Sequence, residues 1–358
     1  MKANLTIILI AVLGLFITSC KETTTSEPSA SPEQVFTIAI HGGAGAMPKG
    51  TYTPEQEAAF HAKLKEAAQL GYEMLSRGDS AVDVVQAVIC MLEDSPLFNA
   101  GKGSVFTKEG KIQMDAAIMN GRTLDCGSVN NIQRVQNPIK VARMVMDSSK
   151  YIMFSGEGAE QFAQLNNIPQ ADASYFYTQH QYERWKGMKD STEGKYIRYV
   201  DSVMALQNIP TVLNNIEEKF GTVGCVVKDK YGNLAAGTST GGLMNKKFNR
   251  IGDSPIIGAG TYASNNTCAI SCTGTGEDFI KTVAAKTVAD LMEFKGLTLE
   301  AATNELIHVR FKEIKGDGGL IAIDKNGCFY VSDEKNNRVL TKSHPQLKKY
   351  DICKDIWN

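Results

Sequence analysis

Helical and strand-like spacings of apolar residues occupy separate blocks of this chain. Apolar stripes and capping signals predict helices over 54–76, from Ser80 to before Pro96, and over 138–146, 156–165, 276–295 and 299–314. Short β-branched runs predict buried strands at 35–40, 222–228, 234–238, 256–262, 267–273, 319–324 and 327–332. Two further pieces, 104–106 and 112–114, are expected to pair as a hairpin across 108–111. Helices grouped on the faces of antiparallel sheets predict an α+β fold, a four-layer αββα sandwich.

Three of these helices begin with recognisable capping residues. Thr53 is the candidate N-cap of the first helix, Pro54 takes its first position, and Gln56 can close a capping box. Ser80 and Asn137 stand in the same place before the second and third helices. We therefore expect side-chain hydrogen bonds in their first turns.

The chain begins with a segment that is typical of exported proteins. Lys2 gives a positive start, residues 5–17 are apolar, and Thr18-Ser19-Cys20 places small residues before a cysteine. The apolar run is short for a transmembrane helix and predicts a signal peptide over 1–19. The residues ending at Cys20 resemble a bacterial lipobox, which implies that Cys20 is lipidated. An ordinary signal peptide with an incidental cysteine is the alternative.

The polar run 21–32 is rich in Thr, Ser, Glu and Pro and is expected to be a disordered tether. We therefore divide the chain into a signal peptide at 1–19, a lipid-anchored tether at 20–34 and a single domain at 35–358. This organisation predicts export across the inner membrane. The mature protein would be periplasmic and held to a bacterial membrane only through its lipid.

Composition excludes several classes of function. The 358 residues carry 38 basic and 39 acidic side chains, a balance that gives no sign of a nucleic-acid partner. The cysteines after Cys20 are odd in number and scattered, which does not fit a disulfide framework. Cys268 and Cys272 lack a matching Cys or His pair, so we expect no structural zinc site. The chain also lacks the HExxH and P-loop motifs.

The segment 166–221 mixes polar and aromatic residues without strong periodicity and is predicted to be a surface linker. It ends at Gly221-Thr222, where a buried strand begins. If the bond between these residues is cleaved, Thr222 gains a free α-amine with a pKa of about 7.7–8.0 beside its own hydroxyl. That pairing activates a threonine as a nucleophile, and glycine permits a strained backbone. The alternative is an ordinary strand that starts with threonine.

Three polar clusters downstream could complete a site. Thr240, at the end of a strand before two glycines, can hydrogen-bond a nucleophile. Arg250 and Asp253 flank a glycine, and together they could hold the carboxylate and the ammonium of a free amino-acid end. Backbone N–H groups along Thr273-Gly274-Thr275-Gly276 can face an oxyanion. Each cluster alone also fits an ordinary strand end or a surface ion pair.

Together these motifs resemble the plant-type asparaginases, also called isoaspartyl peptidases, which are N-terminal nucleophile hydrolases with the αββα sandwich. The match extends from about Phe36 to Asp324, and the combination is specific. Asn249 departs from the family, which often has glycine there. The shared motifs are His41-Gly-Gly-Ala-Gly45, Pro96-Leu-Phe-Asn-Ala-Gly-Lys-Gly103, Met114-Asp-Ala-Ala117, Gly221-Thr-Val-Gly224, Thr238-Ser-Thr-Gly-Gly242, Arg250-Ile-Gly-Asp-Ser-Pro255 and Thr273-Gly-Thr-Gly276.

The resemblance implies autocleavage followed by hydrolysis. Thr222 would cut the chain after Gly221, giving an α piece (20–221) and a β piece (222–358), and would then act as the nucleophile. The implied substrates are L-asparagine and β-aspartyl dipeptides, and the implied assembly is an (αβ)2 heterotetramer. No cofactor is implied for catalysis.

Other matched residues would assist Thr222. Thr240 would support its hydroxyl, Thr273 with the Gly274 backbone would form an oxyanion hole, and Asn99 would orient the site. The implied substrate-binding residues are Arg250 for the α-carboxylate, Asp253 for the α-amine, and Gly274 and Gly276 through their backbones. A structural sodium or potassium ion is implied in the loop 92–102. Its ligands would be the backbone carbonyls of Leu92, Glu93, Ser95, Phe98, Ala100 and Lys102.

Two alternatives remain beside this interpretation. One is a glycosylasparaginase, a related family that usually has Asp before the nucleophilic threonine where this chain has Gly221. The other is a non-catalytic lipoprotein that uses the same fold for binding. The full set of matched site residues argues against the second alternative.

Overall fold

The computed structural model describes residues 36–43, 53–188, 194–204 and 221–333, which belong to one unit that begins at Gln34. Its helices are α1 (Pro54–Arg77), α2 (Ala81–Glu93), η1 (Gly101–Gly103), α3 (Pro138–Ser148), α4 (Gly156–Leu165), η2 (Ala173–Phe176), α5 (Gln179–Gly187), α6 (Gly194–Met204), α7 (Gly276–Thr282), α8 (Ala284–Lys295), α9 (Leu299–Asn304), η4 (Glu305–Arg310) and α10 (Phe311–Ile314). Its strands are β1 (Thr37–His41), β2 (Met114–Asn120), β3 (Cys126–Ile132), β4 (Met153–Ser155), β5 (Val223–Lys228), β6 (Leu234–Thr240), β7 (Thr261–Ala263), β8 (Cys268–Gly274), β9 (Gly318–Asp324) and β10 (Phe329–Asp333). None of the helices described here is long and apolar enough to cross a membrane.

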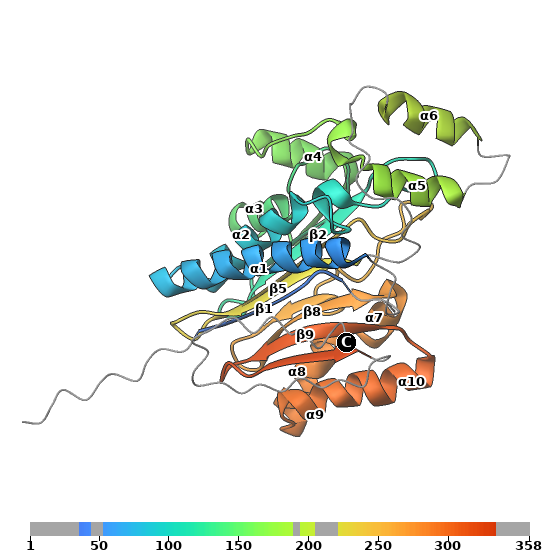
Figure 1. Ribbon diagram of the computed structural model, residues 1–358. Coiled ribbons are helices and arrows are strands. Elements are labelled where there is room, and N and C mark those ends of the chain that lie inside the picture. The colour runs from blue at the N-terminus through green and yellow to red at the C-terminus, as the bar shows by residue number, and fades with distance from the viewer. Residues whose placement is uncertain (1–35, 44–52, 189–193, 205–220, 334–358) are drawn as a thin grey trace, which may run out of the picture. The chain divides into compact units, whose positions relative to one another are not determined.

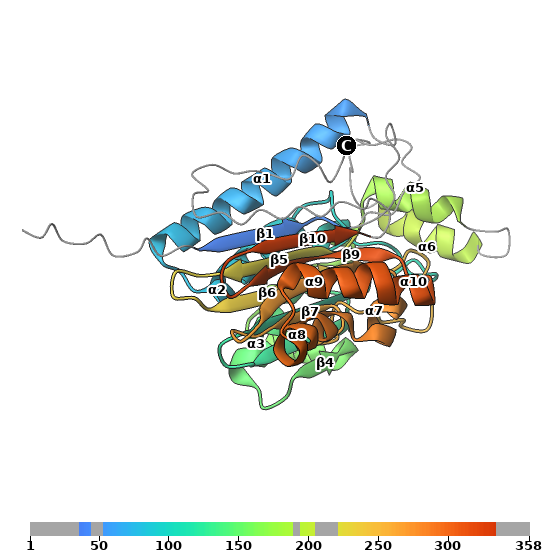
Figure 2. The same ribbon diagram turned by 90° about the horizontal axis from the view of Figure 1, so that it is seen from below.

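The described strands form two sheets that face each other. The larger sheet has the order β1-β5-β6-β2-β3-β4 and the smaller one the order β10-β9-β8-β7. All neighbours pair antiparallel except β3 and β4, which are parallel. Helices α1 and α2 lie on the outer face of the larger sheet (Figure 1), and α8 and α9 cover the outer face of the smaller one (Figure 2). This order of layers confirms the predicted αββα sandwich.

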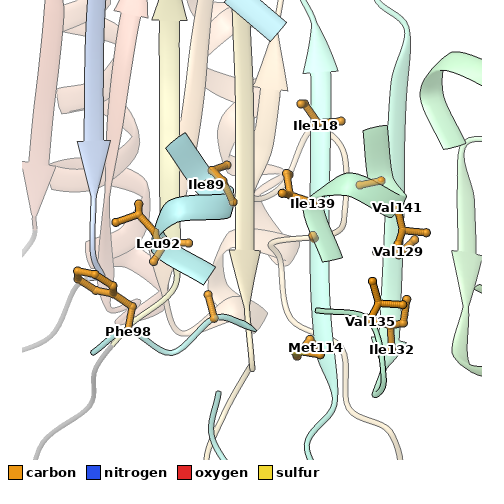
Figure 3. Close-up of a cluster of buried hydrophobic side chains, with 14 of the residues drawn as sticks. Ile89, Leu92, Phe98, Met114, Ile118, Val129, Ile132, Val135, Ile139 and Val141 are labelled. Carbon is orange, nitrogen blue, oxygen red and sulfur yellow. The ribbon is translucent and has the colours of Figure 1, made fainter. Parts of the chain in front are cut away.

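Three clusters of buried side chains hold the layers together. The first joins α1, α2 and α3 to the larger sheet, and Figure 3 shows its side chains, among them Ile89 and Leu92 of α2 and Ile118 of β2. The second joins α8 and α9 to the smaller sheet. The third lies between the sheets and includes Val226 and Ile321. Burial of apolar area at about 25 cal/mol per Å² is the main term that stabilises such a stack.

Helix starts follow the predicted capping in two of three cases. Thr53 and Gln56 form the reciprocal hydrogen bonds of a capping box at α1. Ser80 accepts the backbone N–H of Asp83 at α2. Asn137 does not cap α3, because its amide instead donates to Asp94 at 2.9 Å. The tertiary contact with the end of α2 replaces the local cap.

Several strands differ from the predicted ones. The expected hairpin of 104–106 with 112–114 is reduced to a single bridge between Phe106 and Ile112. The predicted strand 256–262 is mostly loop, because Gly258 adopts φ +91° and the chain straightens only from Thr261. The strands β3 and β4 and most of β2 were not predicted. In β3 the pattern is hidden by Asn130 and other polar residues that are buried.

The predicted helix 276–295 is broken in two. Val283 adopts φ +46° and ψ +50°, a left-handed conformation that is costly for a β-branched residue. The α8 backbone then donates hydrogen bonds from Ala285 and Lys286 to the carbonyls of Ala259 and Gly258. The break therefore aims the start of α8 at the loop that precedes β7.

The prediction of a surface linker over 166–221 is wrong for its first part. Residues 173–187 form η2 and α5, and Trp185 is fully buried there. Trp185 Nε1 donates to the carbonyl of Thr107 at 2.7 Å, and Gln181 Nε2 donates to that of Gly103 at 2.9 Å. The aromatic residues of this segment lack helical periodicity because they pack into the core, and not because the segment is a surface linker. Residues 205–220 lie outside the described part of the chain.

Candidate active site

Thr222 lies at the entrance of β5 and is buried beside Thr240. Residue 222 is 9% exposed, and its Oγ1 donates a hydrogen bond of 2.9 Å to Oγ1 of Thr240. The pairing of Val223 with Ser239 brings the start of β5 beside the end of β6. Thr240 Oγ1 also accepts the backbone N–H of Gly242 at 3.0 Å. Because the Thr222 hydroxyl donates its proton to Thr240, its lone pairs remain available to attack a carbonyl carbon.

Strand β8 brings Thr273 to the same end of the sandwich. Thr238 in β6 and Ser271 in β8 face each other across the two sheets, with their hydroxyl oxygens 2.7 Å apart. Two positions before Thr238 and before Ser271, each strand contributes a side chain to the apolar cluster between the sheets. Two positions after this pair lie Thr240 in one strand and Thr273 in the other. The side chains of the two β strands therefore place Thr273 and the exposed Gly274 at the end where Thr222 lies.

Asp253 is a buried carboxyl in the loop between β6 and β7. It is 4% exposed, and its Oδ2 has no hydrogen-bond partner among the residues that the structure describes. Burial raises the pKa of Asp253 to about 7, although its own backbone N–H and the Arg250 charge oppose the rise. Burial, and then the charge of Asp253, raise the pKa of Cys272, the residue before Thr273. An unpaired buried carboxyl at this place can receive a ligand ammonium group.

Arg250 is held by Glu277 and by two glycines. Its Nε and Nη2 donate to the two carboxylate oxygens of Glu277 at 2.8 and 2.7 Å. A Cβ on Gly252 would lie 2.8 Å from Nη1, and a Cβ on Gly276 would lie 2.8 Å from Nη2. A Cβ on Gly276 would also lie 2.9 Å from the Asp253 backbone nitrogen. Gly276 therefore lies against both charged residues, and the Nη1–Nη2 edge of Arg250 can receive a carboxylate.

Two loops fix the backbone around Thr222. Asn99 Nδ2 donates to the carbonyl of Gly242 at 2.8 Å, and the Asn99 carbonyl accepts the N–H of Gly241 at 2.9 Å. These bonds fix the turn that follows Thr240. On the other side, a Cβ on Gly43 would lie 2.4 Å from the backbone nitrogen of Gly221, and Gly43 has φ +122°. Only glycine permits this loop to touch the residue before Thr222.

The loop 92–102, where the resemblance implies an alkali cation, is tightly packed along its backbone. A Cβ on Gly101 would lie 2.3 Å from the Glu93 carbonyl oxygen, and a Cβ on Gly103 would lie 2.1 Å from that of Phe98. The loop thus turns two of the six expected carbonyls toward glycines that leave them room, and carbonyl oxygens suit hard cations. The described residues contain no group of three His, Cys, Asp or Glu side chains that could hold a metal ion. A bound cation would stabilise the loop that carries Asn99, and this stays a prediction.

Two positions near Arg250 were not recognised as important from the sequence. Glu277 reads there as an ordinary acidic residue in the first turn of a helix. Asn249 has φ +54°, a conformation that favours glycine, which explains why the family often has glycine there. Here Gln113 Nε2 donates to Asn249 Oδ1 at 2.8 Å, and Asn131 Nδ2 donates to its carbonyl at 3.2 Å. The departure from glycine was the signal that could have pointed to this anchored turn.

A family model of asparaginases matches residues 34–350 of this chain. The chain belongs to the asparaginase family. Similar proteins include an isoaspartyl peptidase of Salmonella typhimurium, 44% identical over 290 residues, which are 81% of this chain and 89% of the relative. A probable isoaspartyl peptidase/L-asparaginase 2 of Arabidopsis thaliana is 42% identical over 303 residues, 82% of this chain and 90% of the relative. A plant-type L-asparaginase of Pyrococcus horikoshii is 42% identical over 292 residues, with shares of 81% and 90%.

This membership confirms the resemblance that the motifs indicated, and it makes the chain one of the hydrolases. The matched segment spans every residue of the asparaginase-family site described above. It begins at residue 34, after the predicted signal peptide and nearly all of the predicted tether. The comparisons therefore concern the folded body of the chain.

Gly276→Ala is expected to weaken substrate binding without unfolding the protein. The added methyl group would push against Arg250 Nη2 and the Asp253 backbone, which are both closer than a Cβ contact allows. We expect KM for L-asparagine to rise roughly tenfold, the scale of a misplaced charged group. Steady-state kinetics measure this, with Gly158→Ala as a control in open space. An unchanged KM would contradict the assigned contact.

Proposed function

We propose that this chain is an autoprocessed isoaspartyl peptidase/L-asparaginase whose nucleophile is the N-terminal threonine of its β piece, Thr222. The observation that carries the proposal is the buried hydroxyl pair of Thr222 and Thr240, with an oxygen–oxygen distance of 2.9 Å. The names of the relatives give the substrate class, β-aspartyl dipeptides and L-asparagine. Arg250 and Asp253 offer opposite charges for an amino-acid end of that kind.

The first reaction is cleavage of the chain. Oγ1 of Thr222 attacks the carbonyl carbon of Gly221, the C–N bond breaks, and the acyl group moves to the threonine oxygen as an ester. Water then hydrolyses the ester, which leaves a carboxylate on Gly221 and a free amine on Thr222. The contact of Gly43 with the Gly221 backbone fixes the bond that is attacked.

The second reaction is hydrolysis of the substrate. The new α-amine of Thr222 takes the proton of its own hydroxyl, and Oγ1 attacks the β-carbonyl carbon of the substrate. Thr273 and the Gly274 backbone would stabilise the negative oxygen of the intermediate. Ammonia or an amino acid leaves with the proton from the amine, and water hydrolyses the β-aspartyl ester to L-aspartate. The α-carboxylate would rest on Arg250 and the α-ammonium on Asp253.

The test of the proposed function compares three substrates on the cleaved protein. We expect ammonia from L-asparagine and leucine from β-Asp-Leu, with little release from a glycosylated asparagine. Preferred hydrolysis of the glycosylated substrate would instead indicate a glycosylasparaginase. An uncut chain that is inactive on all three would support the non-catalytic alternative.

We further propose that the chain is exported and anchored through Cys20, and that cleaved αβ units pair as (αβ)2. The support for export is the apolar run 5–17 followed by small residues and a cysteine. Cys20→Ala is expected to move the protein from the membrane fraction to the soluble periplasmic fraction and to abolish incorporation of labelled palmitate. Cys328→Ala, a change within the folded body, should leave both unchanged. Labelling that persists in Cys20→Ala would contradict the anchor.

A further inference from the structure

We propose that Glu277 is a positioning and specificity-determining residue, which fixes the Arg250 guanidinium so that its outer edge selects substrates with a free α-carboxylate. The inference rests on the proposed function, because it takes Arg250 as the group that binds the substrate carboxylate. Glu277 is the second residue of α7 and lies 27 positions after Arg250. It touches no reacting atom and acts through Arg250.

The geometry assigns one edge of Arg250 to Glu277 and leaves the other to the ligand. The contact with Glu277 is bidentate and uses Nε and Nη2. The described residues offer no hydrogen-bond acceptor to Nη1, and Nη2 keeps a second hydrogen. The Nη1–Nη2 fork therefore remains available for a second bidentate carboxylate. A guanidinium that is held along one edge presents the other edge in a single orientation, which lowers the entropy lost on binding.

The alternative is that Glu277 competes with the substrate for Arg250. A competitor would occupy the fork that the substrate needs, whereas Glu277 occupies the side-on edge. Gly252 and Gly276 also restrict the guanidinium on two sides, so Arg250 has little freedom to turn its other edge outward. The side chain of Arg250 is 19% exposed and that of Glu277 is 46% exposed. Glu277 therefore lies on the solvent side of this ion pair, and Arg250 lies on the side of the site.

Glu277 also affects the neighbouring carboxyl. The groups that act on Asp253 are Arg250, which lowers its pKa, and Glu277, which raises it. The hydrogen bond from Arg250 is the largest cause of the lowered pKa of Glu277, and the charges of Arg250 and Lys281 lower it further. Loss of the Glu277 charge would therefore leave the Arg250 charge less opposed at Asp253. The part of the acid limb that Asp253 sets, below the titration of the Thr222 amine, would then move to lower pH.

The experiment compares Glu277→Ala and Glu277→Gln with the wild type on L-asparagine and on L-aspartic acid diamide, which lacks the α-carboxylate. For L-asparagine we expect KM to rise roughly tenfold in Glu277→Ala with a nearly unchanged kcat, as one side chain loses its fixed orientation. On the diamide both variants should match the wild type. The ratio of kcat/KM for L-asparagine to kcat/KM for the diamide should therefore be smaller in the variants. In Glu277→Gln the part of the kcat/KM acid limb that Asp253 sets, below the titration of the Thr222 amine, should shift to lower pH. Glu157→Ala, an exposed acid in the first turn of α4, is the matched control.

Three results would overturn the inference. An equal loss on both substrates would make Glu277 a general structural residue, and a lower KM for L-asparagine in Glu277→Ala would make it a competitor. If the part of the acid limb that Asp253 sets, below the titration of the Thr222 amine, stays at the same pH in Glu277→Gln, Glu277 does not act on Asp253. Wild-type protein that neither cleaves itself nor hydrolyses L-asparagine would instead contradict the proposed function, whatever the variants do. Cleavage and melting temperature of each variant show that it has folded.

Discussion

Thr222→Ala is expected to leave the chain as one uncut polypeptide and to remove hydrolysis of L-asparagine. The methyl side chain offers no oxygen to attack the Gly221 carbonyl, and the α-amine that would serve as base is never released. Removal of a nucleophile of this kind lowers kcat by roughly 10⁴–10⁶-fold. Intact-mass measurement and a denaturing gel detect the cleavage, and ammonia release measures the activity.

Thr222→Ser is the informative companion variant. Its hydroxyl can still donate to Thr240 and attack Gly221, although a serine side chain has more rotational freedom than a β-branched threonine. We expect it to cleave more slowly than the wild type and to keep measurable activity. Efficient cleavage of Thr222→Ala after Gly221 would contradict the proposed mechanism, because only the Thr222 hydroxyl is proposed to attack the Gly221 carbonyl carbon.

The parts of the fold that were predictable are those set by local pattern. The capping box of Thr53 and Gln56 defines the start of α1, and it needs only residues three positions apart. The terminal hairpin of β9 and β10 follows from two apolar runs around a glycine turn. The break at Val283 was not predictable, since a β-branched residue in a left-handed conformation contradicts local preference. It is held by contacts with Gly258 and Ala259, which are distant in sequence.

The candidate site shows the same division. The motifs placed Thr222, Thr240 and Arg250 at strand ends and in a loop, where the structure has them. The partners of these residues depend on the packing of separate segments. Glu277 reaches Arg250 only because α7 follows β8 in the smaller sheet, and no spacing in the sequence encodes a pair 27 residues apart. Such contacts have to be read from the fold.

Asp253→Asn is expected to lower kcat/KM for L-asparagine by roughly 10²–10³-fold, because truncating one partner of a buried charge pair costs about 2–5 kcal/mol. The asparagine side chain keeps the shape but cannot pair with the α-ammonium of the substrate. In the wild type Asp253 has to be ionised, so kcat/KM should fall as the pH drops through about 7. A second requirement, the free amine of Thr222 with a pKa of about 7.7–8.0, acts in the same direction. In Asp253→Asn only that second requirement should remain.

The stability of Asp253→Asn is expected to change in the opposite direction from its activity. Folding raises the pKa of Asp253 from its usual 3.8 to about 7, since burial disfavours the charge. The stabilising contribution of the neutral carboxyl is therefore complete below pH 3.8 and is lost as the pH rises to about 7. Asparagine stays neutral, so at pH 8 the variant should melt at a higher temperature than the wild type, and at low pH the difference should vanish. Scanning calorimetry of the cleaved proteins across pH 3–8 measures both limits. If the variant is less stable than the wild type at pH 8, Asp253 already has a cationic partner in the free enzyme. Its carboxylate would then not be available to bind the ammonium group of a substrate.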